Sequence, residues 1–335
     1  MQARQGAASN QMSCTVAIIN WNSGRWLRPC VESLLATTTT ADILVIDNAS
    51  EDASLESIEG FRNRVNLVQN SVNRGFAAAV NQAFHATTTT YVLILNPDVR
   101  AMPGAVQLLE EFLDVQPRVA AVGGYVGDRY LPKALPSIKS LVRENLGLRA
   151  VGAVGEARAR QREASRGEAR ARQREASRND RRGTGSPEPR SVEQPAAAAL
   201  MVRRDAYDDV GGFDEQFYPA WYEDVDFCQR LKEKGWEVYF APKAQFLHEG
   251  GYSAETMGAP DFLRSYYSNQ LRYARKHFGM LGTAAVRASI AAGMIGRMIG
   301  RPTQAARYGK TFIWALRGMS GSECKPDRAK QSKKW

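Results

Sequence analysis

The sequence predicts an α/β fold with a mostly parallel central sheet, and three observations support this. Between residues 14 and 125, short runs rich in β-branched residues alternate with segments of helical spacing, a pattern typical of βαβ units. The run Val92 to Leu95 is apolar throughout, as expected for a parallel strand covered on both faces. At 335 residues, the chain has ample length for a substantial core in one large or two ordinary domains.

Strands and helices are expected in regular alternation through the first part of the chain. The predicted strands are TVAIIN at 15–20, DILVID at 42–47, VNLVQN at 65–70 and YVLILN at 91–96, with AAVGGYV at 120–126 as a further candidate. Helical spacing is found at 23–36, 54–61, 75–86 and 103–115. Residues 132–148 are expected to form a loop and a short helix.

A low-complexity insertion interrupts this pattern at about 150–186. GEARARQREASR occurs at 155–166 and again at 167–178, with almost no apolar residues to bury. We interpret it as a solvated insertion. The alternative, a nucleic-acid-binding segment, lacks the interleaved aromatic residues that stack on bases.

Regular structure is expected to resume after the insertion. AALMV at 198–202, EVYFAP at 237–242 and AQFLHE at 244–249 are predicted strands. A helix is expected at 224–235, where Gly235 is a stop signal. The amphipathic helix at 262–279 is expected to close the body of the fold.

The charge of the chain is concentrated near its C-terminus. Residues 272–335 contain 14 Lys and Arg against 2 Asp and Glu, whereas the chain outside this segment and the insertion is net acidic. The acidic body argues against a nucleic-acid enzyme. The basic C-terminal segment suggests a site of attachment to an anionic surface. Ile, Met, Phe and Trp are interspersed with arginines at 280–320, and Pro302 divides that segment into two expected amphipathic helices. We predict that they lie at a membrane surface; the alternative is that they pack on the body.

Compartment signals are few. The four cysteines show no metal or disulfide spacing, which indicates a reducing compartment. Residues 1–13 are polar and without a signal-peptide pattern, and are expected to be disordered. No run of about 18 uninterrupted apolar residues suggests a membrane span. Residues 321–335 form a basic tail.

Three sets of polar residues stand at the edges of apolar elements. Asp98 follows a buried strand after Pro97, at the strand end where open α/β sheets bind ligands, although Asn-Pro-Asp is also an ordinary turn. Glu223 and Asp224 precede a helix, where they are either functional or merely favourable to the helix dipole. His248 follows AQFL and is either a ligand or a satisfied buried histidine.

Taken together, these motifs resemble a known family. IINWN, VIDNASED, NRGFAAAVNQA, LNPDV, VGGFDEQFYPAWYEDVDFCQRLKEKGW and HEGG occur in the order typical of family 2 inverting glycosyltransferases, with the bacterial rhamnosyltransferase type as the nearest branch. The resemblance covers 14–279 except the insertion. It implies a GT-A fold, a Rossmann-like arrangement for nucleotide-diphospho-sugars, with a nucleotide-binding half at 14–130 and an acceptor half at 190–279.

The resemblance also implies a donor site. Asp98 would bind a divalent cation that stabilises the diphosphate leaving group, and His248 would complete the site; carboxylate suits Mg²⁺ or Mn²⁺, and imidazole favours Mn²⁺. Asn96 stands in the ribose or metal shell. Asp47 would accept the N3–H of a pyrimidine. The residues expected around the nucleoside and the diphosphate are Asn20, Asn22, Asn48, Ser50, Asp52 and Arg74.

The chemistry implied is a single displacement at the anomeric carbon. One general base on the acceptor side suffices, and Asp224 matches the base of the family's E-D motif. Glu223 would orient the acceptor or donor sugar, with Trp221 and Tyr222 lining that side. Asp226 is expected to anchor the start of the helix.

The prediction is therefore a metal-dependent inverting glycosyltransferase for a cell-envelope polysaccharide or glycolipid, placed on the cytoplasmic face of the membrane. The expected donor is dTDP-rhamnose, with UDP- and GDP-sugars left open, and the expected acceptor is a glycan or a glycolipid. The alternative is a catalytically silent relative that binds nucleotide or carbohydrate. No nucleic-acid partner is expected.

Overall fold

The computed structural model describes residues 13–38, 41–148, 188–248, 259–300 and 302–317. The predicted N-terminal segment up to residue 12, the arginine-rich insertion and the basic tail lie outside these residues. The described residues divide into two compact units: 13–135 with 188–248 form the first, and 136–148 with 260–317 form the second. Each unit is considered by itself.

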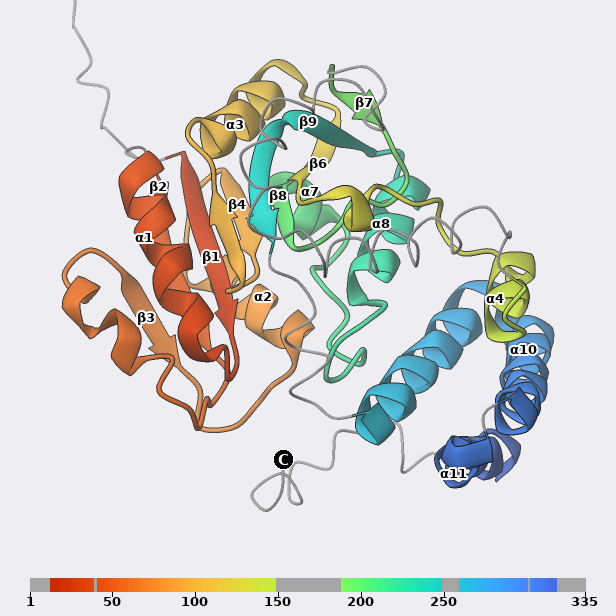
Figure 1. Ribbon diagram of the computed structural model, residues 1–335. Helices are drawn as coiled ribbons and strands as arrows, with labels where there is room; N and C mark the ends of the chain where they lie inside the picture. Colours follow the sequence, from red (N-terminus) through yellow and green to blue (C-terminus); the bar gives the residue numbers. More distant parts are fainter. Residues whose placement is uncertain (1–12, 39–40, 149–187, 249–258, 301, 318–335) are drawn as a thin grey trace, which may run out of the picture. The chain divides into compact units, whose positions relative to one another are not determined.

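The first unit is built on a mixed sheet whose first part is parallel (Figure 1). β1 (Cys14–Asn20) lies between β2 (Ala41–Asp47) and β4 (Tyr91–Leu95), and β3 (Asn66–Gln69) pairs with β2, all in parallel. β8 (Ala199–Arg203) runs antiparallel to both β4 and β6 (Val119–Tyr125), and β9 (Glu237–His248) is parallel to β6. Two short strands, β5 (Val99–Ala101) and β7 (Arg190–Ser191), pair antiparallel with β9.

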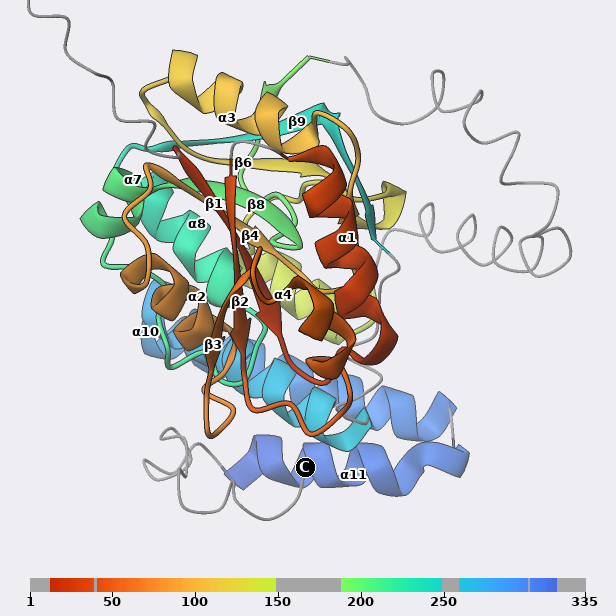
Figure 2. The same ribbon diagram turned by 90° about the vertical axis from the view of Figure 1, so that its left-hand side faces the viewer.

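Helices cover both faces of this sheet (Figure 2). Val16 and Ile18 of β1 join the core cluster under α1 (Leu27–Thr37) and α3 (Ala105–Val115). Ala17 and Ile19 join the opposite cluster, under α2 (Phe76–His85), α7 (Arg204–Asp209) and α8 (Glu223–Glu233). Alternate side chains of a strand point to opposite faces, so a strand between two helical layers is buried throughout. The predicted α/β class is confirmed.

Most predicted elements occur within a residue or two of their expected bounds, and two differ. Residues 56–61 form a 3₁₀ helix, η2 (Glu56–Phe61), instead of an α-helix. The strands expected at 237–242 and 244–249 form the single strand β9. The pairing of β9 with β6 shifts register between Ala241 and Gln245, so Pro242 lies where the ladder is irregular and its missing N–H breaks no regular pairing. Two further short 3₁₀ helices are η1 (Gly24–Trp26) and η3 (Asp128–Tyr130).

The second unit consists of helices. α4 (Ile138–Asn145) lies against α10 (Ala259–Gly300), where the buried Asn145 amide nitrogen donates to Gln270 Oε1 and Ser289 Oγ, each at 2.9 Å. Gly279 interrupts α10 with a φ of 67°. η4 (Pro302–Gln304) and α11 (Ala305–Arg317) follow, so the chain is helical on both sides of Pro302 as predicted.

The helix expected to close the body, at 262–279, is part of α10 and belongs to this second unit. By length and composition, Phe262–Gly300 is long and apolar enough to cross a membrane, although a third of its most apolar stretch is buried. The sequence shows no uninterrupted apolar run there because Arg287 breaks it. The core helix of a soluble protein meets the same criterion, so composition alone does not distinguish the two.

Candidate active site

The predicted site residues follow strands that end at one edge of the sheet. β1, β2 and β4 are parallel, so their carboxyl ends, marked by Asn20, Asp47 and Asn96, share that edge. β8 begins there, since Ala199 pairs with Leu95 at the end of β4. β6 runs opposite to β8, and β9 runs with β6, so both also end there. Open α/β sheets bind their ligands at this edge.

The first group of site residues surrounds Asp47, whose side chain is buried. The Asn20 amide nitrogen donates to Asp47 Oδ1 at 2.7 Å and lies 3.1 Å from the hydroxyls of Ser50 and Ser54. Ser50 donates to the same carboxylate through its hydroxyl, at 2.6 Å, and through its backbone N–H, at 3.1 Å. Uncharged donors therefore hold the carboxylate at the end of β2.

The neighbouring loops extend this group. The Asn22 N–H donates to Ser50 Oγ at 2.9 Å, and Asp52 accepts the Gly24 N–H at 2.7 Å. Asn48 donates to the carbonyl of Gly75 at 3.1 Å and accepts the backbone N–H of Arg74 at 3.3 Å. The six residues predicted around the nucleoside end, including Asp47, thus lie in one hydrogen-bonded cluster, and Arg74 is joined to it by its backbone while its side chain is exposed.

The second group is the pair Asp98 and His248, which the sequence separates by 150 positions. The antiparallel pairing of β5 with β9 places Val99 opposite His248. His248 Nε2 then lies 3.3 Å from Asp98 Oδ1, and both side chains are nearly fully buried. The ring of Tyr130 packs on the imidazole at a centroid distance of 4.5 Å. His248 Nδ1 is buried and has no hydrogen-bond partner in the part of the chain that the structure describes.

This pair is chemically suited to a divalent cation. Two neighbouring ligands of one cation are about 3 Å apart when each bond is about 2.1 Å long, close to the separation seen here. Among the described residues, no group of three or more His, Cys, Asp or Glu side chains could hold a metal. The Asn96 N–H bonds the carbonyl of Ala198 at 3.1 Å, which fixes its backbone near the start of β8.

The third group lies at the start of α8. Trp221 and Tyr222 both have positive φ, 75° and 72°, an uncommon conformation for bulky residues that turns the chain sharply into the helix. Asp224 follows and accepts a weak hydrogen bond from Gln194 at 3.4 Å and one from the Val225 N–H at 2.8 Å. Burial raises the pKa of Asp224, while these donors and the nearby Lys133 charge oppose the increase.

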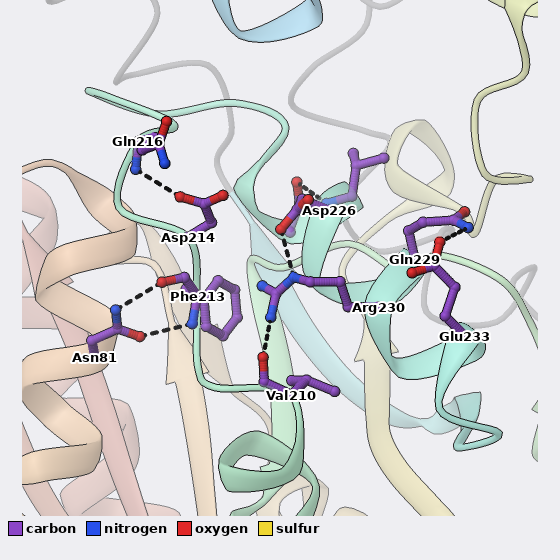
Figure 3. A network of polar contacts seen from close by, with 11 residues as sticks. Asn81, Val210, Phe213, Asp214, Gln216, Asp226, Gln229, Arg230 and Glu233 are labelled. Carbon is purple, nitrogen blue, oxygen red and sulfur yellow. Dashed lines mark hydrogen bonds and ion pairs between the residues drawn. The ribbon is translucent and has the colours of Figure 1, made fainter. Parts of the chain in front are cut away.

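A network of long-range hydrogen bonds supports the loop that leads to α8 (Figure 3). Asn81 of α2 accepts the Phe213 N–H at 2.9 Å and donates to the Phe213 carbonyl at 2.8 Å. Arg230 of α8 pairs with Asp226 at 2.8 Å and donates to the carbonyl of Val210 at 2.6 Å. Asp226 therefore supports this loop through Arg230.

Sequence reasoning missed several of these supporting residues. Asn81, Gln194 and Arg230 act through contacts with residues far away in the sequence or through backbone groups, which leave no local pattern. Asn81 lies within the NRGFAAAVNQA motif, and this was the one signal available for it.

The chain was compared with known protein families. Residues 15–172 match the model "Glycosyl transferase family 2", and residues 189–250 match "N-terminal domain of galactosyltransferase". The chain contains a glycosyltransferase family 2 domain. This domain begins at β1 and includes the Asp47 cluster and Asp98, and the second match spans Asp224 and His248.

Curated relatives of this glycosyltransferase domain include two bacterial proteins. An N-acetylglucosaminyl-diphospho-decaprenol L-rhamnosyltransferase of Mycobacterium tuberculosis is 28% identical over 79% of this chain and 85% of its own length. A pre-mycofactocin glycosyltransferase of the same organism is 30% identical over 73% of this chain, which spans only 44% of that protein.

Solved structures show the same fold. A mannosyltransferase from Pyrobaculum calidifontis in complex with GDP-Man and Mn²⁺ aligns with a TM-score of 0.50 and 15% identity over 91% of this chain and 84% of its own. GalNAc-T7 with UDP, GalNAc and Mn²⁺ aligns with a TM-score of 0.53 and 13% identity over 81% of this chain and 51% of its own. The glycosyltransferase domain therefore has the GT-A fold that the motifs implied.

Proposed function

We propose that the protein is an inverting glycosyltransferase that moves a sugar from a nucleotide-diphospho-sugar to a hydroxyl group of a lipid-linked or cell-envelope glycan. One observation carries this proposal: the stretches that match the two glycosyltransferase models together hold a carboxylate–imidazole pair, Asp98 and His248, and a carboxylate with a raised pKa, Asp224. The carboxylate–imidazole pair could hold a cation beside the diphosphate leaving group, and the carboxylate with the raised pKa could accept the proton of the attacking hydroxyl. We further propose 14–130 as the nucleotide-binding half and 190–279 as the acceptor half.

Asp98 and His248 are the residues that would hold a divalent cation, Mn²⁺ or Mg²⁺. When bound, the cation would supply charge neutralisation at the diphosphate as the sugar departs. The Asp47 cluster would bind the nucleoside, with the carboxylate as acceptor for a pyrimidine N3–H. Its hydrogen bonds to Asn20 and Ser50 hold that acceptor in a fixed position before the ligand arrives.

Asp224 would act as the general base that takes the proton from the acceptor hydroxyl. A base works best when its pKa lies near the working pH, and burial moves the pKa of Asp224 in that direction. Gln194 and the Val225 N–H orient its two oxygens, leaving the side chain partly exposed for an incoming hydroxyl. A single base of this kind is compatible with inversion at the anomeric carbon.

The proposed donor is dTDP-rhamnose and the proposed acceptor is a polyprenyl-diphosphate-linked sugar. This choice is supported by the rhamnosyltransferase relative, which is named for rhamnose transfer and for an N-acetylglucosaminyl-diphospho-decaprenol acceptor. UDP- and GDP-sugars are the donor alternatives.

We propose that the second unit attaches the protein to the anionic cytoplasmic face of a membrane, where such an acceptor would be found. Residues 262–317 contain ten Lys and Arg and no Asp or Glu. Met280 and Leu281 after the kink at Gly279, and Ile299 at the end of α10, are apolar side chains exposed to solvent. Exposed apolar side chains among basic ones are typical of interfacial helices.

Sugar transfer tests the proposal directly. The full chain would be incubated with Mn²⁺, N-acetylglucosaminyl-diphospho-polyprenol and, in turn, dTDP-rhamnose, UDP-galactose and GDP-mannose. Asp224→Asn should lower the rate by about 10²- to 10⁴-fold. Glu233→Gln changes an exposed residue on the same helix and should leave the rate unchanged. Equal rates for both variants would refute the role of Asp224.

A further inference from the structure

Glu223 differs from the other buried acidic side chains described in this domain. Each of the others has a side-chain partner: Asn20 and Ser50 for Asp47, His248 for Asp98, Ser13 for Glu110 and Arg230 for Asp226. Glu223 is only 5% exposed, and its Oε2 is buried without a hydrogen-bond partner in the described part of the chain. A buried carboxylate without a counter-charge is costly, because the protein does not replace the hydration that the anion loses.

The strongest electrostatic influences on Glu223 favour the neutral acid, and its own backbone N–H opposes them. Loss of hydration raises its pKa well above the usual value, and the neighbouring Asp224 carboxylate raises it further. The positive charge of Lys133 lowers the pKa of Asp224. Asp224 also has Gln194 and the Val225 N–H as donors, so it is the member of the pair that ionises more readily.

We propose that Glu223 is protonated in the resting enzyme and donates a hydrogen bond from its carboxyl O–H to a hydroxyl of the bound sugar. This rests on the proposed glycosyl transfer and assigns opposite tasks to two adjacent residues. Asp224 accepts the proton of the acceptor hydroxyl. Glu223 keeps its own proton and donates a hydrogen bond to a sugar hydroxyl. Oε2 is the carboxyl oxygen for which the described part of the chain supplies no hydrogen-bond partner, and Glu223 directly precedes the proposed base.

Such a pair is a known way for one site to hold both an acid and a base. Two carboxyl groups in different surroundings have separate pKa values and can serve as donor and acceptor at the same pH. A site built to hydrogen-bond a hydroxyl also discriminates against ligands that lack it, because its buried polar group would then remain unpaired. Glu223 is therefore expected to contribute to sugar selectivity.

The sign of the pH effect follows from the raised pKa. In the unfolded chain Glu223 ionises near its usual pKa, whereas in the folded protein it keeps its proton to higher pH. Folding then loses stability as pH rises from the unfolded pKa to the folded one, and nothing is lost below the unfolded pKa. Glu223→Gln removes this loss, so the variant should become increasingly more stable than the wild type as the pH rises from about 5.

Two measurements on the full chain test the proposal. Thermal unfolding across that pH range compares wild type, Glu223→Gln and the exposed control Glu233→Gln. Steady-state transfer compares wild type with Glu223→Gln, which keeps a donor, and Glu223→Ala, which does not. At about pH 6.5, kcat/KM should be kept within about threefold in the glutamine variant and fall at least about tenfold in the alanine variant.

The kinetic arm also identifies the sugar that is bound. A rise in the KM of the nucleotide-sugar alone in Glu223→Ala would assign the hydroxyl to the donor, and a rise for the acceptor alone would assign it to the acceptor. Both results support the proposal. A glutamine variant as inactive as the alanine variant, or one whose stability follows the same pH profile as the wild type, would overturn it. Absence of transfer by the wild type would refute the proposed function instead, while the unfolding profile would still report on the proton.

Discussion

At the scale of single residues, the account depends on Asp98 and His248 acting together. His248 Nε2 lies 3.3 Å from Asp98 Oδ1 although the sequence separates the two residues by 150 positions. Behind them, Cys30 is buried, and burial together with the Asp98 charge raises the pKa of its thiol. Its thiol therefore favours the neutral form.

This pair gives a prediction for nucleotide binding. In calorimetric titrations with dTDP, UDP and GDP, the protein should bind one nucleotide more tightly when Mn²⁺ is present. Asp98→Ala should lower that metal-dependent affinity at least about tenfold, because one of two protein ligands is lost.

The matched control is Asp42→Ala. Asp42 is an exposed acidic residue near the start of β2, at the opposite edge of the sheet. Equal affinities of the two variants, or affinity independent of Mn²⁺, would contradict the assignment of Asp98.

At the scale of elements, the loop before α8 is held against the start of α2. Gly75 has a φ of 86°, and a Cβ there would lie 2.8 Å from the Tyr218 ring and 3.1 Å from the Pro219 carbonyl oxygen. The Phe76 N–H donates to that same carbonyl at 2.7 Å. The glycine therefore permits both the turn into α2 and the close approach of the segment that leads to Trp221 and Asp224.

A pair of glycine variants separates these two effects. Gly127 has a backbone conformation close to that of Gly75 (φ 108° and ψ 156°, against 86° and 163°) but open space around it, so Gly127→Ala should cost only the backbone strain, about 1–3 kcal/mol of unfolding free energy. Gly75→Ala adds a clash of about 1–3 kcal/mol and should also lower sugar transfer. Urea unfolding measures both variants, and equal losses would show that the packing of residues 218–219 is unimportant.

Element types were largely predictable from the sequence, because apolar spacing determines which segments form strands and helices. The orientation of β8 was not, since AALMV reads alike whether its partners are parallel or antiparallel. The contact between Asp98 and His248 was expected from the family resemblance alone, and no local pattern indicated it. It depends on β5, a strand of three residues that is too short to give a pattern. Family resemblance indicated the residues of the site, whereas their hydrogen-bond partners came only from the structure.

At the scale of the whole molecule, the two units differ in charge. The chain outside the insertion and the C-terminal segment is net acidic. In the helices at 262–317, by contrast, every Lys, Arg, Asp or Glu position is a Lys or an Arg. Under the membrane proposal, the basic helices are the part of the chain that an anionic surface would attract.

Vesicle binding tests this asymmetry. Arg275, Lys276 and Lys310 are exposed on α10 and α11, and changing all three to Gln should weaken binding to anionic vesicles about tenfold or more at low salt. Lys232, Lys234 and Lys243 are exposed in the first unit and give a control of equal charge change. Equal binding by the two triple variants, or no binding by the wild type, would contradict the membrane proposal.

We propose that the acceptor hydroxyl displaces the nucleoside diphosphate from the anomeric carbon in a single step, with Asp224 as base. The most direct test is NMR spectroscopy of the transferred sugar, which reports the configuration of its anomeric carbon in the product relative to the donor. We expect inversion of the anomeric configuration, with product formation lost in Asp224→Asn and kept in Glu233→Gln. A product of retained configuration, or no transfer from any donor by folded protein, would contradict it.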